Sequence, residues 1–219
     1  MIHSLLLKND LDITHEDTIT STIIGTLLHL PDQLFWEILR EACFNNQNLP
    51  QNIGNLTEYE FWPKWISHGT TNTNYVEPDV FLRFQELDLI IEAKRFDDGG
   101  QYQGEWEREL IAYENEYGVT DKPVLLVAIG GNGNNIRKEQ LEINGQKRTI
   151  IKCAWANLHK ILDDRRMDFQ ENHKRIIESL HIVCVPLGIR SYRQLDARPW
   201  VSDFNIMILD TYHDLIFRK

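Results

Sequence analysis

Two acids and a lysine lie at the ends of neighbouring apolar segments, at a spacing that suits the hydrolysis of a phosphodiester. The first acid is Asp79 in the segment Glu77-Pro78-Asp79-Val80, and Glu92 and Lys94 close the segment Ile90-Ile91-Glu92-Ala93-Lys94. Two carboxylates can hold a hard divalent cation through oxygen ligands, and a lysine on the same face can support the attacking water or the charge that builds on phosphorus. These residue types therefore indicate a metal-dependent phosphodiesterase.

The order of side chains in the second segment predicts how its acid and its lysine are presented. Successive side chains on a strand point to opposite faces of the sheet, so Glu92 and Lys94 face the same way. The run from Leu87 to Ala93 is apolar except for Asp88 and Glu92, which is typical of a strand covered on both faces. Because buried charges without partners are costly, these two side chains must pair with each other, with Asp79 or with a metal.

A structural alternative gives these residues no chemistry. Pro78-Asp79 is then an ordinary turn, and Glu92 and Lys94 are an ion pair at the end of a strand. The triplet Glu92-Ala93-Lys94 is the one acid-x-lysine in the chain, and the other Pro-Asp pair, Pro31-Asp32, has no such triplet near it. The elements that surround the motif must decide between the two interpretations.

Helices and strands are predicted on both sides of the motif. Apolar residues recur at helical spacing through 17–44, and Pro31 divides that segment into two helices. Turn residues and apolar runs place the other elements. These are a polar loop over 45–57, a strand near 61–67, turns over 69–74, a hairpin of strands 80–84 and 87–94, a helix over 105–117 ended by Gly118, strands over 123–129 and 149–154, and helices over 158–167 and 172–180.

With this order of elements, the chain resembles the PD-(D/E)XK nuclease superfamily, which has the restriction-endonuclease-like fold. The match covers roughly residues 14–160. It implies an α/β protein with an α-β-β-β-α-β core, a mixed central sheet flanked by helices, and extra N-terminal and C-terminal helices. With 219 residues and 42% hydrophobic content, the chain can form one sizeable core, so we expect a single domain over 1–219 with a helical extension over about 161–219.

The resemblance also assigns roles to the motif. Asp79 and Glu92 match the metal ligands of the family, the carbonyl of Ala93 matches an additional oxygen ligand, and Lys94 matches the catalytic lysine. The implied cofactor is Mg²⁺ or Mn²⁺. The implied function is hydrolysis of DNA by an endonuclease, in a bacterial defence or mobile-element system.

Many members of the family add an acid from the first helix. Here the candidate is Glu16, just ahead of an apolar helical run, with Asp17 and then Glu41 as alternatives. The structural explanation for Glu16 and Asp17 is helix-start chemistry, since acids are favourable at the N-terminus of a helix.

Nucleases of this family often carry a glutamine on the helix after the lysine strand. Gln103 and Gln101 both lie there, and Gln103 is preferred, although no Gln-x-x-x-Tyr follows. Trp155, after the last strand, is interpreted as a core residue.

The net charge of −10 is unusual for a DNA-binding protein, because it repels nucleic acid at long range. Part of it is concentrated in the predicted helix over 105–117, where five glutamates crowd together. Weak intrinsic affinity for DNA is therefore expected, with a homodimer or a partner protein delivering the substrate. An alternative function is a catalytically silent nuclease-fold module within a larger nucleic-acid-processing complex, with the acidic helix as its partner surface.

Other features of the sequence narrow the class of protein. The three cysteines are far apart and the eight histidines are scattered, so neither a disulfide framework nor zinc is predicted. The segment Gly130–Asn135 lacks the Gly-Lys-Ser/Thr ending of a phosphate-binding loop and is interpreted as a turn. No apolar run approaches the roughly 20 residues that span a bilayer, and no signal peptide is recognised, so we expect a cytoplasmic protein without a membrane partner.

Overall fold

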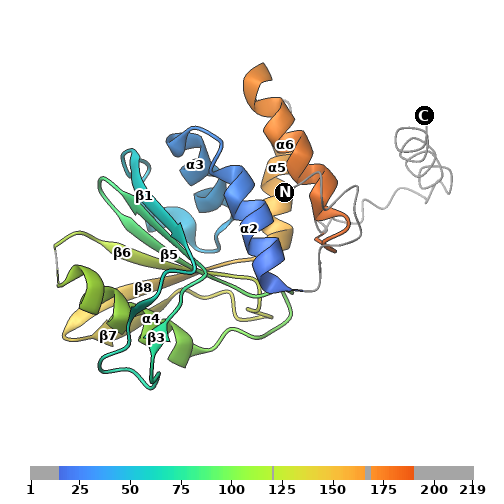
Figure 1. Ribbon diagram of the computed structural model, residues 1–219. Helices are drawn as coiled ribbons and strands as arrows, with labels where there is room; N and C mark the ends of the chain where they lie inside the picture. The colour runs from blue at the N-terminus through green and yellow to red at the C-terminus, as the bar shows by residue number, and fades with distance from the viewer. Residues whose placement is uncertain (1–14, 120, 166–168, 190–219) are drawn as a thin grey trace.

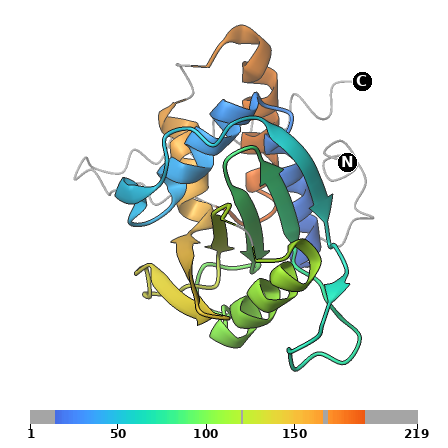
Figure 2. The same ribbon diagram turned by 90° about the vertical axis from the view of Figure 1, so that its left-hand side faces the viewer.

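The computed structural model describes residues 15–119, 121–165 and 169–189, which form an α/β protein with one large sheet between two helical layers (Figure 1). The sheet has six strands in the order β1-β4-β5-β6-β8-β7. Its strands are β1 (Leu56–Phe61), β4 (Val80–Phe84), β5 (Asp88–Ala93), β6 (Val124–Ile129), β7 (Glu139–Ile143) and β8 (Gln146–Cys153). Helices α2, α3, α5 and α6 cover one face, and α4 covers the other (Figure 2).

The helices follow the predicted order. They are α2 (Glu16–Leu27), α3 (Asp32–Ala42), α4 (Gln103–Tyr117), α5 (Trp155–Asp164) and α6 (Glu171–Cys184), with a short 3₁₀ turn at Asn46–Asn48. Pro31 separates α2 from α3, and α4 ends at Gly118, as predicted. Within the described ranges, no helix has both the length and the apolar character that crossing a membrane requires. Residues from 190 onward, which include most of the expected C-terminal extension, lie outside the described residues.

The sheet is mixed, with its parallel part at the centre. β4 pairs antiparallel with β5 as the predicted hairpin, whereas β5, β6 and β8 run parallel to one another. Each parallel connection needs a crossover, which α4 supplies between β5 and β6. The carboxyl ends of the three parallel strands consequently meet at one edge of the sheet, and Lys94 directly follows β5 there.

The side chains of β5 alternate between two hydrophobic cores, one on each face of the sheet. Leu89, Ile91 and Ala93 belong to the core beneath α2, α3, α5 and α6. Ile90 belongs to the core beneath α4, and all six residues of β5 are buried. The prediction that this strand is covered on both faces is therefore confirmed, and Glu92 shares the α4 face with Ile90.

Two predictions about strands were wrong. The strand expected near 61–67 lies earlier, as β1, and stops at Phe61 because Trp62 has a φ of 53° and Pro63 has no backbone N–H to pair. Two further residues of that range form β2 (Trp65–Ile66), which pairs with β3 (Tyr75–Val76) outside the main sheet.

Strand β7 was not predicted, although the sequence carried a signal for it. β7 and β8 form a hairpin whose turn is Asn144-Gly145, with φ of 48° and 78°. An Asn-Gly pair between alternating apolar residues, here Leu141 and Ile143, is a strong short-range hairpin signal. β8 consequently begins at Gln146, three residues before the predicted start.

Candidate functional site

The motif residues converge at the carboxyl end of β5. Asp79 lies directly before β4, and its Oδ2 accepts a hydrogen bond from the Ala93 N–H at 2.7 Å. The Nζ of Lys94 lies 2.5 Å from Oε1 of Glu92. Asp79 and Glu92 are 8% and 6% exposed, so the structure places two buried carboxylates and a lysine together. The shared direction of Glu92 and Lys94 is the one that the alternation predicted. The role of the Ala93 carbonyl as a ligand stays a prediction.

Two more acids contact the same lysine. Glu16, the first residue of α2, has its Oε1 3.8 Å from Lys94 Nζ, and Glu105 of α4 has its Oε2 3.4 Å from that atom. Of the alternatives to Glu16, Asp17 is exposed and Glu41 pairs with Arg165 of α5 at 3.4 Å. The geometry therefore favours Glu16 as the acid that the first helix adds.

Glu109 of α4 is a further buried acid of this cluster. Its side chain is 4% exposed and hydrogen bonds to Glu92, while its Oε2 has no hydrogen-bond partner. The apolar stripe Trp106, Leu110 and Tyr113 faces the sheet, and Glu109 falls within that stripe. This helical position was the signal in the sequence that could have identified Glu109 as a buried acid.

Crowding of buried acids raises their affinity for protons. Burial raises the pKa of Asp79 to about 8, with further increases from the charges of Glu92 and Glu16, against the lowering effects of the Ala93 N–H and Lys94. Burial also raises the pKa of Glu92 and of Glu109. This cluster therefore holds protons that ordinary carboxyl groups would have lost.

Lys94 stays charged in this environment. Burial alone would lower the pKa of Lys94, but the neighbouring charges of Glu92, Glu16 and Glu105 outweigh that effect and raise the pKa. A persistent ammonium group next to buried carboxylates can stabilise negative charge on a substrate without first gaining a proton.

Gln101, and not Gln103, reaches the backbone of the site. Gln103 is exposed and donates to Glu107 of its own helix at 2.8 Å, so the preference for Gln103 finds no supporting contact. The Nε2 of Gln101 donates to the carbonyl of Glu92 at 3.0 Å, and its Oε1 accepts from Trp106 Nε1 at 2.7 Å. Because α4 begins at Gln103, Gln101 lies in the preceding loop and can turn back toward β5.

The backbone of Lys94 is held by a tryptophan and a glycine. Trp155 is buried, as predicted for a core residue, and its Nε1 donates to the Lys94 carbonyl at 2.7 Å. Gly130 has a φ of +68°, and a Cβ placed there would overlap the same carbonyl. The turn predicted for Gly130–Asn135 therefore packs against the segment that follows Lys94, where Gly131 N–H donates to Phe96 O at 2.5 Å.

The acidic helix α4 is less exposed than its composition suggests. Glu114 is buried and pairs with Arg148 of β8 at 2.7 Å, and Asn144 also donates to it. Together with buried Glu109, this pairing removes part of the partner surface proposed from the sequence. Arg148 is itself buried in this pair and is not exposed to a substrate.

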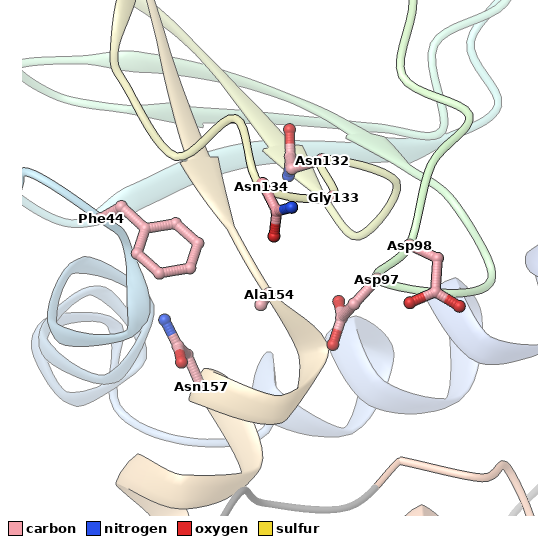
Figure 3. Close-up of a pocket in the computed structure, with 8 residues that line it drawn as sticks. All are labelled: Phe44, Asp97, Asp98, Asn132, Gly133, Asn134, Ala154 and Asn157. Carbon is pink, nitrogen blue, oxygen red and sulfur yellow. The ribbon is translucent and has the colours of Figure 1, made fainter.

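One cavity is lined by residues of the site, and a larger one is not. A cavity of about 220 Å³ is lined by Glu92, Glu105 and Glu109 together with Glu77 and Arg108. A larger cavity of about 510 Å³ lies beyond the carboxyl ends of β6 and β8 and is not lined by these carboxylates (Figure 3). The smaller cavity is therefore the one through which a substrate could meet the motif.

The donor set suits a hard divalent cation. Carboxylate oxygens are the ligands that Mg²⁺ and Mn²⁺ prefer, and the buried Oε2 of Glu109 lacks a hydrogen-bond partner, whereas Oε2 of Glu105 faces only Lys94. Across the described residues, no three His, Cys, Asp or Glu side chains already stand at ligand spacing. Glu92 is paired with Lys94 and Asp79 with the Ala93 N–H, so binding an ion would require these side chains to exchange partners.

The fold and the site define an α/β protein with buried acids gathered around one lysine. No protein-family model matches the chain. A protein of Pasteurella multocida (strain Pm70), named "Uncharacterized protein PM0110", is 29% identical over 189 residues, which span 80% of this chain and 70% of that protein. That name states no activity, and the function must be inferred from the site itself.

Proposed function

We propose that this protein is a Mg²⁺- or Mn²⁺-dependent endonuclease that hydrolyses DNA phosphodiester bonds, with a restriction-endonuclease-like core of the PD-(D/E)XK type. The observation that carries the proposal is the convergence of Asp79, Glu92 and Lys94, since Lys94 Nζ lies 2.5 Å from Glu92 and the Ala93 N–H lies 2.7 Å from Asp79. In the main sheet, the order of helices, the three antiparallel strands β1, β4 and β5, the helix α4 and the strand β6 supports the same core.

Each residue has a distinct task in the proposed reaction. Asp79 and Glu92 would hold the cation, and Glu16 would complete or orient its ligands. When bound, Mg²⁺ or Mn²⁺ activates water and neutralises charge at the phosphate. Lys94 stabilises the negative charge that develops on the phosphate oxygens, or orients the attacking hydroxide, as the in-line displacement proceeds.

Arg108 supplies a second positive charge for the substrate. Among the described residues that line the 220 Å³ cavity, it is the one lysine or arginine, and the glutamates 77, 92, 105 and 109 lie around it. With a net charge of −10, the chain as a whole attracts DNA weakly, so delivery by a partner protein or by dimerisation belongs to this proposal.

Nicking of supercoiled plasmid tests the proposal. We expect cleavage by the wild-type protein with Mg²⁺ or Mn²⁺, no cleavage in EDTA, and a loss of roughly a hundredfold or more in Asp79→Asn, Glu92→Gln and Lys94→Met. Gln103→Ala is the matched control, because Gln103 is exposed and contacts Glu107 only within its own helix. Cleavage that persists in Lys94→Met or in EDTA would rule the mechanism out.

A further inference from the structure

The largest cavity described above has the size of a ligand site. Its volume of about 510 Å³ falls within the range of roughly 300–1,000 Å³ that is usual for small-molecule sites. It lies where the parallel strands β6 and β8 end, which is the crevice that α/β sheets commonly use for ligands. Figure 3 places Phe44 and Asn157 on one side of this cavity, with Asp97 and Asp98 on the other.

The lining of the cavity excludes a phosphate group. Among the described residues around it there is neither lysine nor arginine. The N-terminus of α5, which could otherwise bind an anion, already has one: Asp97 accepts from the Trp155 N–H at 2.9 Å and from the Ala156 N–H at 3.2 Å. A ligand of this cavity is therefore neutral or positively charged.

The same lining suits a flat polar heterocycle. Phe44 offers an aromatic ring, and Asn134 and Asn157 offer amide donors and acceptors. Asp98 adds an exposed carboxylate, which accepts hydrogen bonds when it is ionised. Proteins hold an unpaired nucleobase by stacking it on an aromatic side chain and by hydrogen bonding to the edge of the base.

The cavity is connected to the proposed catalytic lysine. Asp97 follows Lys94 by three residues, and its carbonyl accepts from the Gly133 N–H at 2.8 Å. The backbone N–H of Trp155 donates to Asp97, and the indole N–H of the same residue donates to the Lys94 carbonyl. A base in the cavity would therefore belong to a nucleotide close to the phosphate under attack.

We propose that this cavity binds one unpaired adenine or cytosine through its exocyclic amino group, so that the substrate is single-stranded DNA or DNA with unpaired bases at the cleavage site. The amino group at adenine N6 or cytosine N4 donates to Asp98, whereas thymine presents at the corresponding position a carbonyl oxygen, which cannot donate to a carboxylate. This inference rests on the proposed function for the identity of the polymer, and its binding test does not require catalysis.

Binding of short oligonucleotides in EDTA tests the proposal without cleavage. We expect fluorescein-labelled oligonucleotides of about a dozen nucleotides to bind the wild-type protein in the order dC or dA above dT, with duplex weakest. Phe44→Ala should weaken binding of the dC and dA strands on the order of tenfold, the effect of losing one stacked base. Thermal unfolding of Phe44→Ala checks that this variant remains folded.

Asp98→Ala gives a second test that does not depend on the core. Asp98 is exposed, so the variant should fold, and it should lose the discrimination between dC and dT strands. Asp121→Ala removes the same charge from an exposed position outside the cavity lining and should keep that discrimination.

The outcomes separate this inference from the proposed function. If Phe44→Ala and Asp98→Ala bind every strand as the wild type does, or if no oligonucleotide binds, the base site is overturned. Metal-dependent plasmid cleavage in that case would leave the nuclease proposal standing. Base-dependent binding by a protein that cleaves nothing would support the base site and contradict the nuclease proposal.

Discussion

The indole N–H of Trp155 donates a hydrogen bond of 2.7 Å to the carbonyl oxygen of Lys94, which ties the first residue of α5 to the residue that follows β5. The N–H of Lys94 is held as well, because it donates to Ile129 O of β6 at 2.8 Å. Both backbone groups of the proposed catalytic lysine are therefore fixed by neighbours that are distant in sequence.

Trp155→Phe should reduce cleavage per folded molecule while the metal affinity stays unchanged. The substitution keeps an aromatic ring in the core but removes the donor to Lys94, and one lost hydrogen bond costs about 1 kcal/mol of stability. Trp36→Phe is the matched control, since Trp36 Nε1 donates to Pro50 O at 2.8 Å in another part of the molecule. Plasmid cleavage and urea unfolding should show equal destabilisation in both variants but a slower rate only in Trp155→Phe. Equal rates would contradict a positioning role.

Gly130→Ala should be more destabilising than Gly145→Ala. Both glycines have positive φ, at 68° and 78°, so each alanine carries the left-handed penalty of roughly 1–2 kcal/mol. At Gly145 a Cβ meets nothing within 4 Å, whereas at Gly130 it would overlap the Lys94 carbonyl and approach Trp155. The free energies of unfolding of the two variants provide the comparison, and a similar loss in both would mean that the Gly130 contact is not tight.

The stability of the metal-free protein should fall as the pH rises toward 8. The pKa of Asp79 is about 8 in the folded protein, against about 3.9 for an exposed aspartate, so between these values the folded state binds more protons than the unfolded state. The free energy of unfolding should then decrease by up to about 1.4 kcal/mol per pH unit from this group.

Asp79→Asn isolates that contribution, because asparagine mimics the protonated acid and does not titrate. Urea unfolding in EDTA between about pH 5 and pH 8 should give a shallower pH dependence for Asp79→Asn than for the wild type. Asp121→Asn, at an exposed position, is the control that should follow the wild type. Identical slopes for wild type and Asp79→Asn would mean that Asp79 is already ionised in the folded protein.

Arg108→Ala should weaken DNA binding to a similar degree for every sequence. Arg108 lines the cavity beside Glu92 and Glu105, where it can meet a phosphate, and losing one phosphate contact reduces the salt dependence of binding by about one counterion. Arg175→Ala removes a charge from the exposed side of α6 and serves as the control. Binding isotherms at several salt concentrations distinguish the two, and an unchanged salt slope in Arg108→Ala would exclude the contact.

The part of the site that lies on one strand could be predicted from the sequence. A period of two placed Glu92 and Lys94 on one face, and apolar runs identified β4, β5 and β6 with small errors at their ends. The role of Glu109 could not be found in the same way, because its contact with Glu92 depends on how α4 packs on the sheet. From the sequence, Glu109 was only one of the five glutamates that crowd this helix.

The two glutamines show why helix boundaries limit such predictions. Tyr102, at the N-cap of α4, makes no side-chain capping hydrogen bond, so the sequence has no strong signal for where the helix begins. The start at Gln103 leaves Gln101 free to reach Glu92 O and turns Gln103 toward Glu107. Trp155 was interpreted correctly as a core residue, but its indole N–H could be assigned to Lys94 only from the packed structure.

Binding of Mn²⁺ to the protein in the absence of other divalent cations tests whether Asp79 and Glu92 form a metal site. Titration calorimetry should detect binding by the wild type, its loss in Asp79→Asn and Glu92→Gln, and its retention in Lys94→Met, where Glu92 is released from its ion pair. Glu41→Gln is the control, because Glu41 pairs with Arg165 away from the site. We expect binding that depends on both acids and not on the lysine. Absent binding in the wild type, or equal binding in Asp79→Asn and Glu92→Gln, would contradict it.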